Sequence, residues 1–169
     1  LSFGDYETSG VMQPGEKTAS LTVPMTWLRA IPDAASGIAM VRVQTWEDST
    51  ANCFAAATRT LTVTVPNSAA PQVGACSIAP LLTVGGETFP EVVPGGFVQW
   101  KCGYQVRITG AAGQYGASII RYDVSGVGYS GTGAAFSSGV LMRSGEQQIT
   151  CKVTDSRGLT AATVLTITI

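Results

Sequence analysis

The sequence predicts an all-β fold made of two tandem, antiparallel β-sandwich units. The chain has 169 residues, of which 45% are hydrophobic and 12% charged, so it can bury a core and is not disordered. Its 20 glycines, among many Ser and Thr residues, suit short strands joined by tight turns. Several segments alternate apolar and polar residues with a period of two, and none has the pattern of a long helix.

The clearest predicted strand covers residues 97–109. Within it Trp100, Cys102 and Tyr104 point to one side, while residues such as Lys101 point to the other. Alternation of this length predicts a half-buried antiparallel strand.

A second strand is predicted over residues 146–154, with Ile149, Cys151 and Val153 on its inner face. A third strand follows it and ends at Ile169. Such neighbouring strands, joined by a short turn, form an antiparallel hairpin.

The predicted turn of this hairpin runs from Asp155 through Arg157 to Gly158. The Asp155 side chain can accept a hydrogen bond from the backbone two residues on, and Gly158 can adopt a positive φ angle. Asp155 and Arg157 are also candidates for a recognition patch, but a role in stabilising the turn explains both residues.

Further strands are expected over residues 118–124 and around residues 77–84. Together with weak edge strands in the Gly-rich run 125–139, residues 72–169 hold about seven strand candidates. That number, in roughly 100 residues, is the size of one immunoglobulin-like β-sandwich domain.

Residues 1–66 look like a partial or small β-sandwich-like unit. Paired strands are expected over residues 38–46 and 58–65, and one short helical turn is expected near residues 25–31 between two prolines. Residues 67–71 form the linker, which is short and bounded by prolines and therefore stiff.

The charge pattern and the residue types argue against several function classes. The net charge is −1 and the basic residues are scattered, which does not suit nucleic acid or an anionic membrane. The longest apolar runs are too short to cross a bilayer.

The residue types also argue against catalysis. The chain contains no histidine, and it has no carboxylate pair placed for acid–base work, so we expect no enzyme activity and no cofactor. The adjacent acidic pair Glu47 and Asp48 is interpreted as a solvated loop rather than a metal site.

Four cysteines occur, at Cys53, Cys76, Cys102 and Cys151. None forms a C-x-x-C pair, so neither a metal clip nor a thioredoxin-like motif is indicated. Either they are small buried residues of a protein that folds in a reducing compartment, or Cys102 and Cys151 form a disulfide between facing strands.

Three aromatic residues fall in segments that the sequence predicts to be Gly-rich loops: Tyr115, Tyr129 and Phe136. Their rings are candidates for stacking on sugars of a host glycan, since exposed loops carry function in sandwich folds. The alternative is that they fold back over the end of the core.

Several segments, taken in order, carry a family resemblance: Leu21-Thr22-Val23-Pro24-Met25-Thr26-Trp27-Leu28, Phe97-Val98-Gln99-Trp100-Lys101-Cys102, Tyr115-Gly116-Ala117-Ser118-Ile119 and Val153-Thr154-Asp155-Ser156-Arg157-Gly158. They resemble immunoglobulin-like modules in minor structural (tail or tail-tip) proteins of siphophages that infect Gram-positive bacteria. In such modules a serine is expected where this chain has Cys102, so the resemblance favours free thiols.

This resemblance implies a non-catalytic structural or adhesion module that positions or presents a host-contacting element. Its expected location is the virion tail, assembled in the host cytoplasm, and its expected partners are other tail proteins and a host cell-surface glycan or protein. The chain opens at Leu1 rather than Met, so we expect it to be a piece of a longer protein.

Two alternatives from other classes stay open. One is an interaction module of a bacterial surface adhesin, located at the cell surface or secreted, for which a Lys–Asn isopeptide pair is a typical sign; here the asparagines Asn52 and Asn67 lie in a predicted loop and linker. The other is a carbohydrate-binding accessory module of a cell-wall hydrolase, which typically carries a planar row of exposed aromatic residues.

Overall fold

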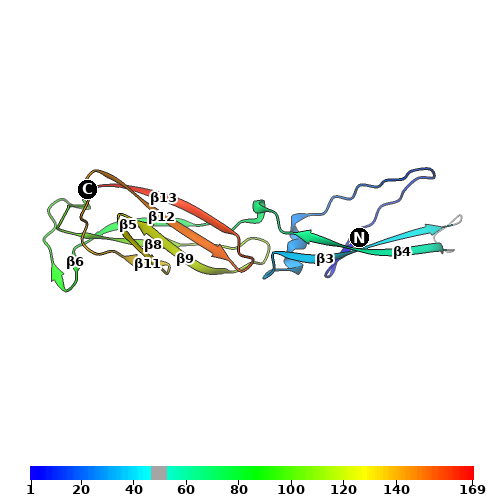
Figure 1. The fold of residues 1–169 in the computed structure, drawn as a ribbon, viewed down its shortest axis with the longest axis horizontal. Coiled ribbons are helices and arrows are strands. Elements are labelled where there is room, and N and C mark those ends of the chain that lie inside the picture. Colours follow the sequence, from blue (N-terminus) through cyan, green and yellow to red (C-terminus); the bar gives the residue numbers. More distant parts are fainter. Residues whose placement is uncertain (47–52) are drawn as a thin grey trace.

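The computed structural model describes residues 1–46 and 53–169. The chain forms an elongated molecule with a smaller N-terminal unit at one end and a larger C-terminal unit at the other (Figure 1). All strand pairs are antiparallel in the described part, and the helical elements there are short 3₁₀ helices. The predicted all-β fold class is therefore confirmed.

The N-terminal unit is a four-stranded sheet in the order β2-β1-β3-β4. Its elements are β1 (Ser2–Phe3), β2 (Tyr6–Glu7), the 3₁₀ helix η1 (Met25–Ala30), β3 (Ser36–Trp46) and β4 (Cys53–Thr64). Helix η1 packs on one face of this sheet, where Phe3, Trp27 and Ala39 form a small buried cluster. The ring of Trp27 also stacks on Tyr6 with a centroid distance of 5.9 Å.

Strands β3 and β4 form a long hairpin, with register pairs from Ser36 and Thr64 to Trp46 and Cys53. Strand β1 pairs with β3 at Met40. From Val41 outward, within the described residues, the hairpin is therefore a ribbon of two strands. Strand β4 begins earlier than the strand predicted at 58–65, and Glu47 and Asp48 lie outside the described residues.

The C-terminal unit contains a four-stranded sheet in the order β10-β9-β12-β13 and a three-stranded sheet in the order β11-β8-β5, beside a small hairpin of β6 and β7. The bounds are β5 (Ala75–Leu81), β6 (Thr83–Val84), β7 (Glu87–Thr88), β8 (Gly103–Thr109), β9 (Ile119–Gly126), β10 (Tyr129–Thr132), β11 (Ala135–Ser137), β12 (Glu146–Asp155) and β13 (Thr160–Thr168).

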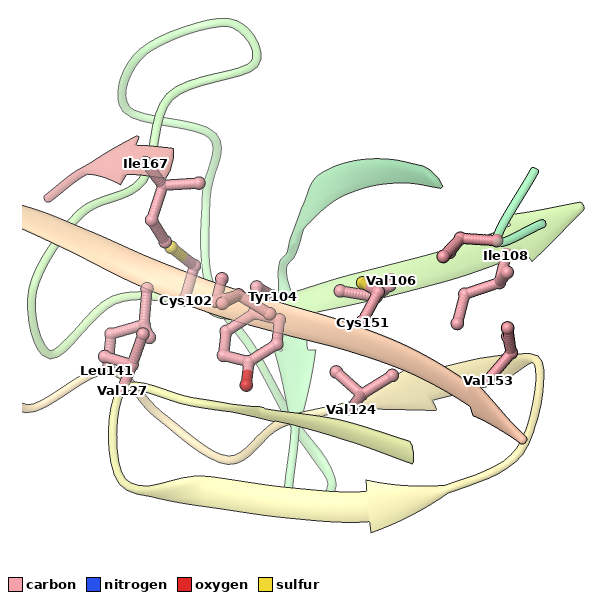
Figure 2. Packing of buried hydrophobic residues seen from close by; sticks show 12 residues of the cluster. Cys102, Tyr104, Val106, Ile108, Val124, Val127, Leu141, Cys151, Val153 and Ile167 are labelled. Atoms are coloured by element: carbon pink, nitrogen blue, oxygen red, sulfur yellow. The ribbon is translucent and has the colours of Figure 1, made fainter. Parts of the chain in front are cut away.

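One buried cluster fills the space between these two sheets (Figure 2). Strand β8 contributes Tyr104 and Val106, while β9 and β12 contribute Val124 and Cys151 from the facing sheet. The buried hydroxyl of Tyr104 donates a hydrogen bond of 3.0 Å to the carbonyl of Gly126, so this polar group does not lose its partner on burial.

The strand predicted over residues 97–109 is shorter than expected, because β8 begins at Gly103. Trp100 adopts a φ angle of 63° and its side chain is 55% exposed, so the chain turns there instead of extending. The Cys102 amide donates to the carbonyl of Val98, which closes this turn. Period-two alternation gave no sign of it, since a turn and a strand can share the same residue pattern.

Between the units, the chain runs from Pro66 through the 3₁₀ helix η2 (Asn67–Ala69) to an isolated bridge of Gln72 with Ala112. The helical turn predicted near residues 25–31 corresponds to η1. Helix η1 and the end of the β12–β13 hairpin lie next to each other at the junction of the two units (Figure 1).

Candidate functional site: the joint between the two units

The turn between β12 and β13 is held by the carboxylate of Asp155. One oxygen, Oδ1, accepts hydrogen bonds from the amides of Arg157 at 3.0 Å and Leu159 at 2.9 Å. The carbonyl of Asp155 also accepts from the amide of Gly158, whose φ angle is 84°. These bonds give the turn a defined shape, and that shape aims the Arg157 side chain out of its own hairpin.

The guanidinium of Arg157 is the central group of the joint. Its Nη2 donates to the carbonyls of Leu28 at 2.9 Å and Tyr115 at 2.7 Å. Its Nε donates to the carbonyl of Ile31 at 3.1 Å, and its Nη1 donates to that of Gln114 at 2.9 Å. One side chain thus ties the C-terminal hairpin both to η1 of the N-terminal unit and to the loop before β9.

Arg157 is only 5% exposed, and among the described residues it forms no ion pair. Its positive charge is balanced instead by backbone carbonyl dipoles. Two of these carbonyls, of Leu28 and of the following cap residue Ile31, lie at the C-terminal end of η1, where the helix dipole places partial negative charge. Each also accepts a backbone amide, from Ile31 and Ala34 respectively, so Arg157 is their second donor. The planar guanidinium, with its several fixed donors, suits this arrangement better than a lysine ammonium does.

Ser156 adds a second polar link. Its hydroxyl donates to the carbonyl of Pro32 at 2.8 Å and accepts from the amide of Ser118 at 3.1 Å. The side chain of Gln114 donates to the carbonyl of Ala70 at 2.8 Å, which fixes the connecting segment against the same loop. The polar contacts therefore involve the hairpin turn, the loop before β9, η1 and the connection between the units.

An apolar cluster covers these polar contacts. Leu28, Val65 and Ala69 are buried, and they are joined by half-buried side chains from both units: Met25, Ile31, Tyr115 and Leu159. Burial in this cluster keeps water away from the guanidinium, and hydrogen bonds in such surroundings are stronger than in water.

Tyr115 adopts a φ angle of 48°, which is uncommon for a residue with a side chain. The strained backbone directs its carbonyl to Arg157 and its ring into the apolar cluster. Sequence reasoning placed Tyr115 in an exposed loop as a glycan contact, whereas the structure places it half-buried in the joint.

The other two aromatic residues also lie elsewhere than expected. Tyr129 belongs to β10 and its hydroxyl donates to the carbonyl of Val140 at 2.7 Å. Phe136 belongs to β11 and packs on Tyr104 with a centroid distance of 5.8 Å. Both rings pack against the core of the C-terminal unit, so the prediction that Tyr129 and Phe136 lie in loops is wrong. The Gly-rich sequence around them forms short edge strands, and the glycines leave room for the rings, as at Gly131 beside Phe136.

All four cysteines are free thiols. Cys102 and Cys151 are buried in the core of the C-terminal unit, but they are not bridged to each other. The neighbouring thiol of Cys151 is Cys76, and burial, reinforced by Cys76, raises the pKa of Cys151 to about 12. The bridged alternative is therefore not what the structure contains.

The remaining surface features are modest. Asp123 forms ion pairs with Arg121 at 2.8 Å and Lys152 at 3.8 Å on the outer face of the larger sheet. In the described part of the chain, no three His, Cys, Asp or Glu side chains gather as metal ligands, and no helix there is long and apolar enough to cross a membrane. An apolar hollow lies between η1 and the end of β4, lined by side chains such as Phe3, Trp27 and Leu61.

Residues 3–169 match a protein family described as siphovirus protein of unknown function (DUF859). The chain belongs to this siphovirus family. The matched residues include both units and the joint. None of the curated proteins compared with the chain matches it.

The role of Arg157 in the joint was missed by sequence reasoning, which assigned it to stabilising its own turn. Arg157 and its acceptor Leu28 are separated by 129 positions. A local sequence pattern cannot reveal a contact between such distant segments. The acceptors are backbone carbonyls, which every residue has, so the residue types at those positions do not indicate the contact either. The turn itself was readable, because Asp155 and Gly158 act within a few residues of each other.

Proposed function

We propose that the protein is a non-catalytic structural module of a phage tail or tail-tip protein, which positions or presents a host-contacting element. The observation that carries this proposal is the joint, in which buried Arg157 donates to four backbone carbonyls of η1 and the loop before β9. A joint of this kind holds two β units in one orientation. Fixed orientation is what an appendage needs in order to hold a distal element at a distance from the particle.

The family match supports a phage structural role, and it favours a phage protein over a bacterial surface adhesin. The strand order supports an immunoglobulin-like interpretation of the C-terminal unit. The sheets β5-β8-β11 and β10-β9-β12-β13 correspond to strands A-B-E and C′-C-F-G of immunoglobulin-type sandwiches. Domains of this class serve as structural spacers on many unrelated proteins, so the fold alone does not assign the function.

The proposed partners are other tail proteins and a host cell-surface glycan or protein. A carbohydrate-binding role for this chain itself receives no support from Tyr129 and Phe136, whose rings pack against the core. We therefore assign the chain the positioning role and leave host contact to the element that it presents.

The proposal is tested by locating the protein in the particle. Antibodies raised against the C-terminal unit, marked with gold, are imaged on intact virions by electron microscopy. We expect label on the tail or its tip. Label on the capsid, or virions that lack the protein altogether, would overturn the proposal.

A second test separates positioning from host binding. A phage carrying Arg157→Ala in this protein is expected to assemble tails of normal length, with the protein incorporated, but to adsorb to host cells more slowly than wild type. Arg121→Ala, which removes only an exposed ion pair, serves as the control and is expected to adsorb normally. Equal adsorption by both variants would argue against a positioning role for the joint.

A further inference from the structure

Two thiols from facing sheets meet in the core of the C-terminal unit. Cys151 lies on β12 and is 0% exposed, and its side chain points into the core between the sheets (Figure 2). Cys76 lies on β5, in the other sheet, and its half-buried side chain packs against the same core. The two thiols are neighbours, and after burial itself Cys76 is the main cause of the raised pKa of Cys151.

Backbone pairing fixes the direction of the Cys76 side chain. Cys76 lies directly opposite Ile108 of β8, and Ile108 is buried in the same cluster as Cys151. Along β5 the side chains alternate between the two faces of the sheet, so that Cys76 and Ile78 pack inward while Ser77 is exposed. The Cys76 thiol therefore projects from its own sheet towards the sheet that carries Cys151.

The remaining buried thiol, that of Cys102, is held by backbone groups instead. Its sulfur donates to the carbonyl of Val98 at 3.5 Å and accepts from the amide of Val98 at 3.2 Å. Figure 2 shows Cys102 on the other side of the Tyr104 ring from Cys151. Cys102 is therefore a natural internal control for any reaction that depends on two adjacent thiols.

We propose that Cys76 and Cys151 are an oxidation site, at which a peroxide converts two thiols into one disulfide between the sheets. Thiols persist in a reducing compartment and oxidise outside it. The disulfide therefore forms after the chain has folded with free thiols, when the protein meets an oxidising medium. The reaction needs only the folded chain and a peroxide, so it does not depend on where the protein lies in a particle.

The reaction has two steps, and the burial of the two thiols sets their order. Cys76 is the half-buried thiol, so its sulfur attacks the peroxide first; the O–O bond breaks, one water leaves, and Cys76 becomes a sulfenic acid. The Cys151 sulfur then attacks the Cys76 sulfur, and its proton leaves with the hydroxyl as a second water. In total the two thiols lose two electrons and two protons, and one hydrogen peroxide becomes two waters.

The position of the two strands determines what the disulfide does. Strand β5 is the last strand of its sheet and pairs only with β8, whereas β12 lies between β9 and β13 in the other sheet. The bridge thus ties an edge strand to an inner strand. It also closes a long loop that contains β6 to β11, which restricts the unfolded chain. We expect the melting temperature of the oxidised unit to rise by roughly 10 °C.

The first measurement maps the disulfides of peroxide-treated protein. The full chain with Cys53→Ser, which removes the exposed thiol of β4, is treated while folded with a small excess of hydrogen peroxide, then alkylated in denaturant and digested. We expect one linked peptide pair that contains Cys76 and Cys151, with Cys102 alkylated. A bridge to Cys102, three alkylated thiols, or sulfinic acid at Cys76 beside an alkylated Cys151 would each overturn the proposal.

Thermal unfolding before and after oxidation supplies the second measurement. The oxidised Cys53→Ser chain is expected to melt roughly 10 °C above the reduced chain, and dithiothreitol is expected to reverse this rise. Adding Cys76→Ser gives the matched variant, because serine is similar in size to cysteine but cannot form the bridge. Its melting temperature is expected to be the same with and without peroxide. An equal rise in the Cys76→Ser variant would show that oxidation elsewhere is responsible and would contradict the proposed site.

Discussion

Two residues at the joint, Gly158 and Tyr115, hold positive φ angles of 84° and 48°, and they do so for different reasons. Gly158 lacks a Cβ atom and adopts this conformation without strain. Tyr115 adopts it because its carbonyl bonds to Arg157 and its ring packs in the apolar cluster. Backbone strain at a residue with a side chain persists only where the surroundings enforce it.

Gly158 offers a clean test of backbone conformation, because a Cβ atom placed there would meet nothing within 4 Å. Gly158→Val is expected to lower the free energy of unfolding by about 1–2 kcal/mol, since a β-branched residue is disfavoured at positive φ. Gly158→Asn is expected to cost clearly less, because asparagine tolerates this region. Urea unfolding of both variants gives the comparison. Equal losses would show that a lost contact, rather than backbone conformation, is responsible.

At the scale of elements, alternation of residue types predicted several strands well and one badly. Strand β12 (Glu146–Asp155) closely follows the predicted 146–154, because its inner residues Ile149, Cys151 and Val153 are fully buried. The segment before Gly103 has the same alternation but turns at Trp100. The difference comes from backbone hydrogen bonds, such as that from the Trp100 amide to the carbonyl of Leu141, and these leave no mark on the residue pattern.

The candidate site was predictable only in its local part. The turn that Asp155 and Gly158 form depends on neighbours in sequence and could be read from them. The target of Arg157 depends on where η1 and the loop at Tyr115 lie in three dimensions. For the same reason Tyr129 and Phe136 were assigned to loops, since Gly-rich sequence is typical of loops and also of short edge strands that must make room for large rings.

The cysteines of the C-terminal unit give a prediction for the core strands. The thiol of Cys53 is exposed on β4, whereas Cys102 and Cys151 are 2% and 0% exposed. Burial raises the pKa of Cys151 from 9.0 to about 12, so at pH 8 its reactive thiolate is rare. With a chromogenic disulfide reagent at pH 8, we expect Cys53 to react rapidly in the native protein and Cys102 and Cys151 to react only upon unfolding.

The raised pKa of Cys151 also makes the free energy of unfolding depend on pH. Because the pKa of Cys151 is higher in the folded protein than in the unfolded chain, its stabilising contribution is complete below pH 9 and is lost as the pH rises towards 12. Rapid labelling of Cys151 at pH 8 under native conditions would contradict both its burial and this dependence.

At the scale of the whole molecule, the joint couples two units of unequal size. The N-terminal unit has only a small buried cluster around Phe3, Trp27 and Ala39, whereas the C-terminal unit has an extensive core. The smaller unit thus depends on contacts outside its own core, and those contacts run through η1 to Arg157.

Removing the guanidinium is therefore expected to uncouple the units. Arg157→Ala leaves the carbonyl of Tyr115 without a donor and takes the charged donor from the carbonyls of Leu28, Ile31 and Gln114, each of which keeps a backbone amide donor. The loss of the donor to one such carbonyl costs about 1–3 kcal/mol. Calorimetry is expected to show one unfolding transition for the wild type and an earlier, separate transition of the N-terminal unit for the variant. Fluorescence of Trp27, which is 6% exposed, reports that earlier transition.

The control for this experiment is Arg121→Ala, which removes an ion pair whose arginine side chain is 62% exposed. Such a substitution changes stability by no more than about 0.5 kcal/mol. A single transition at an unchanged temperature in Arg157→Ala would show that the apolar cluster alone holds the units together.

The four acceptors of Arg157 at the joint are all main-chain carbonyls, while their donor is one side chain. Every residue type has a backbone carbonyl, so other residues at the acceptor positions can make the same hydrogen bonds as long as the backbone conformation there is unchanged. The donor position requires an arginine, because no other residue type offers the same planar set of N–H groups. The two surfaces of this joint are therefore free to diverge at very different rates: substitutions can accumulate around the acceptors, whereas the orientation of the units depends on retaining one arginine.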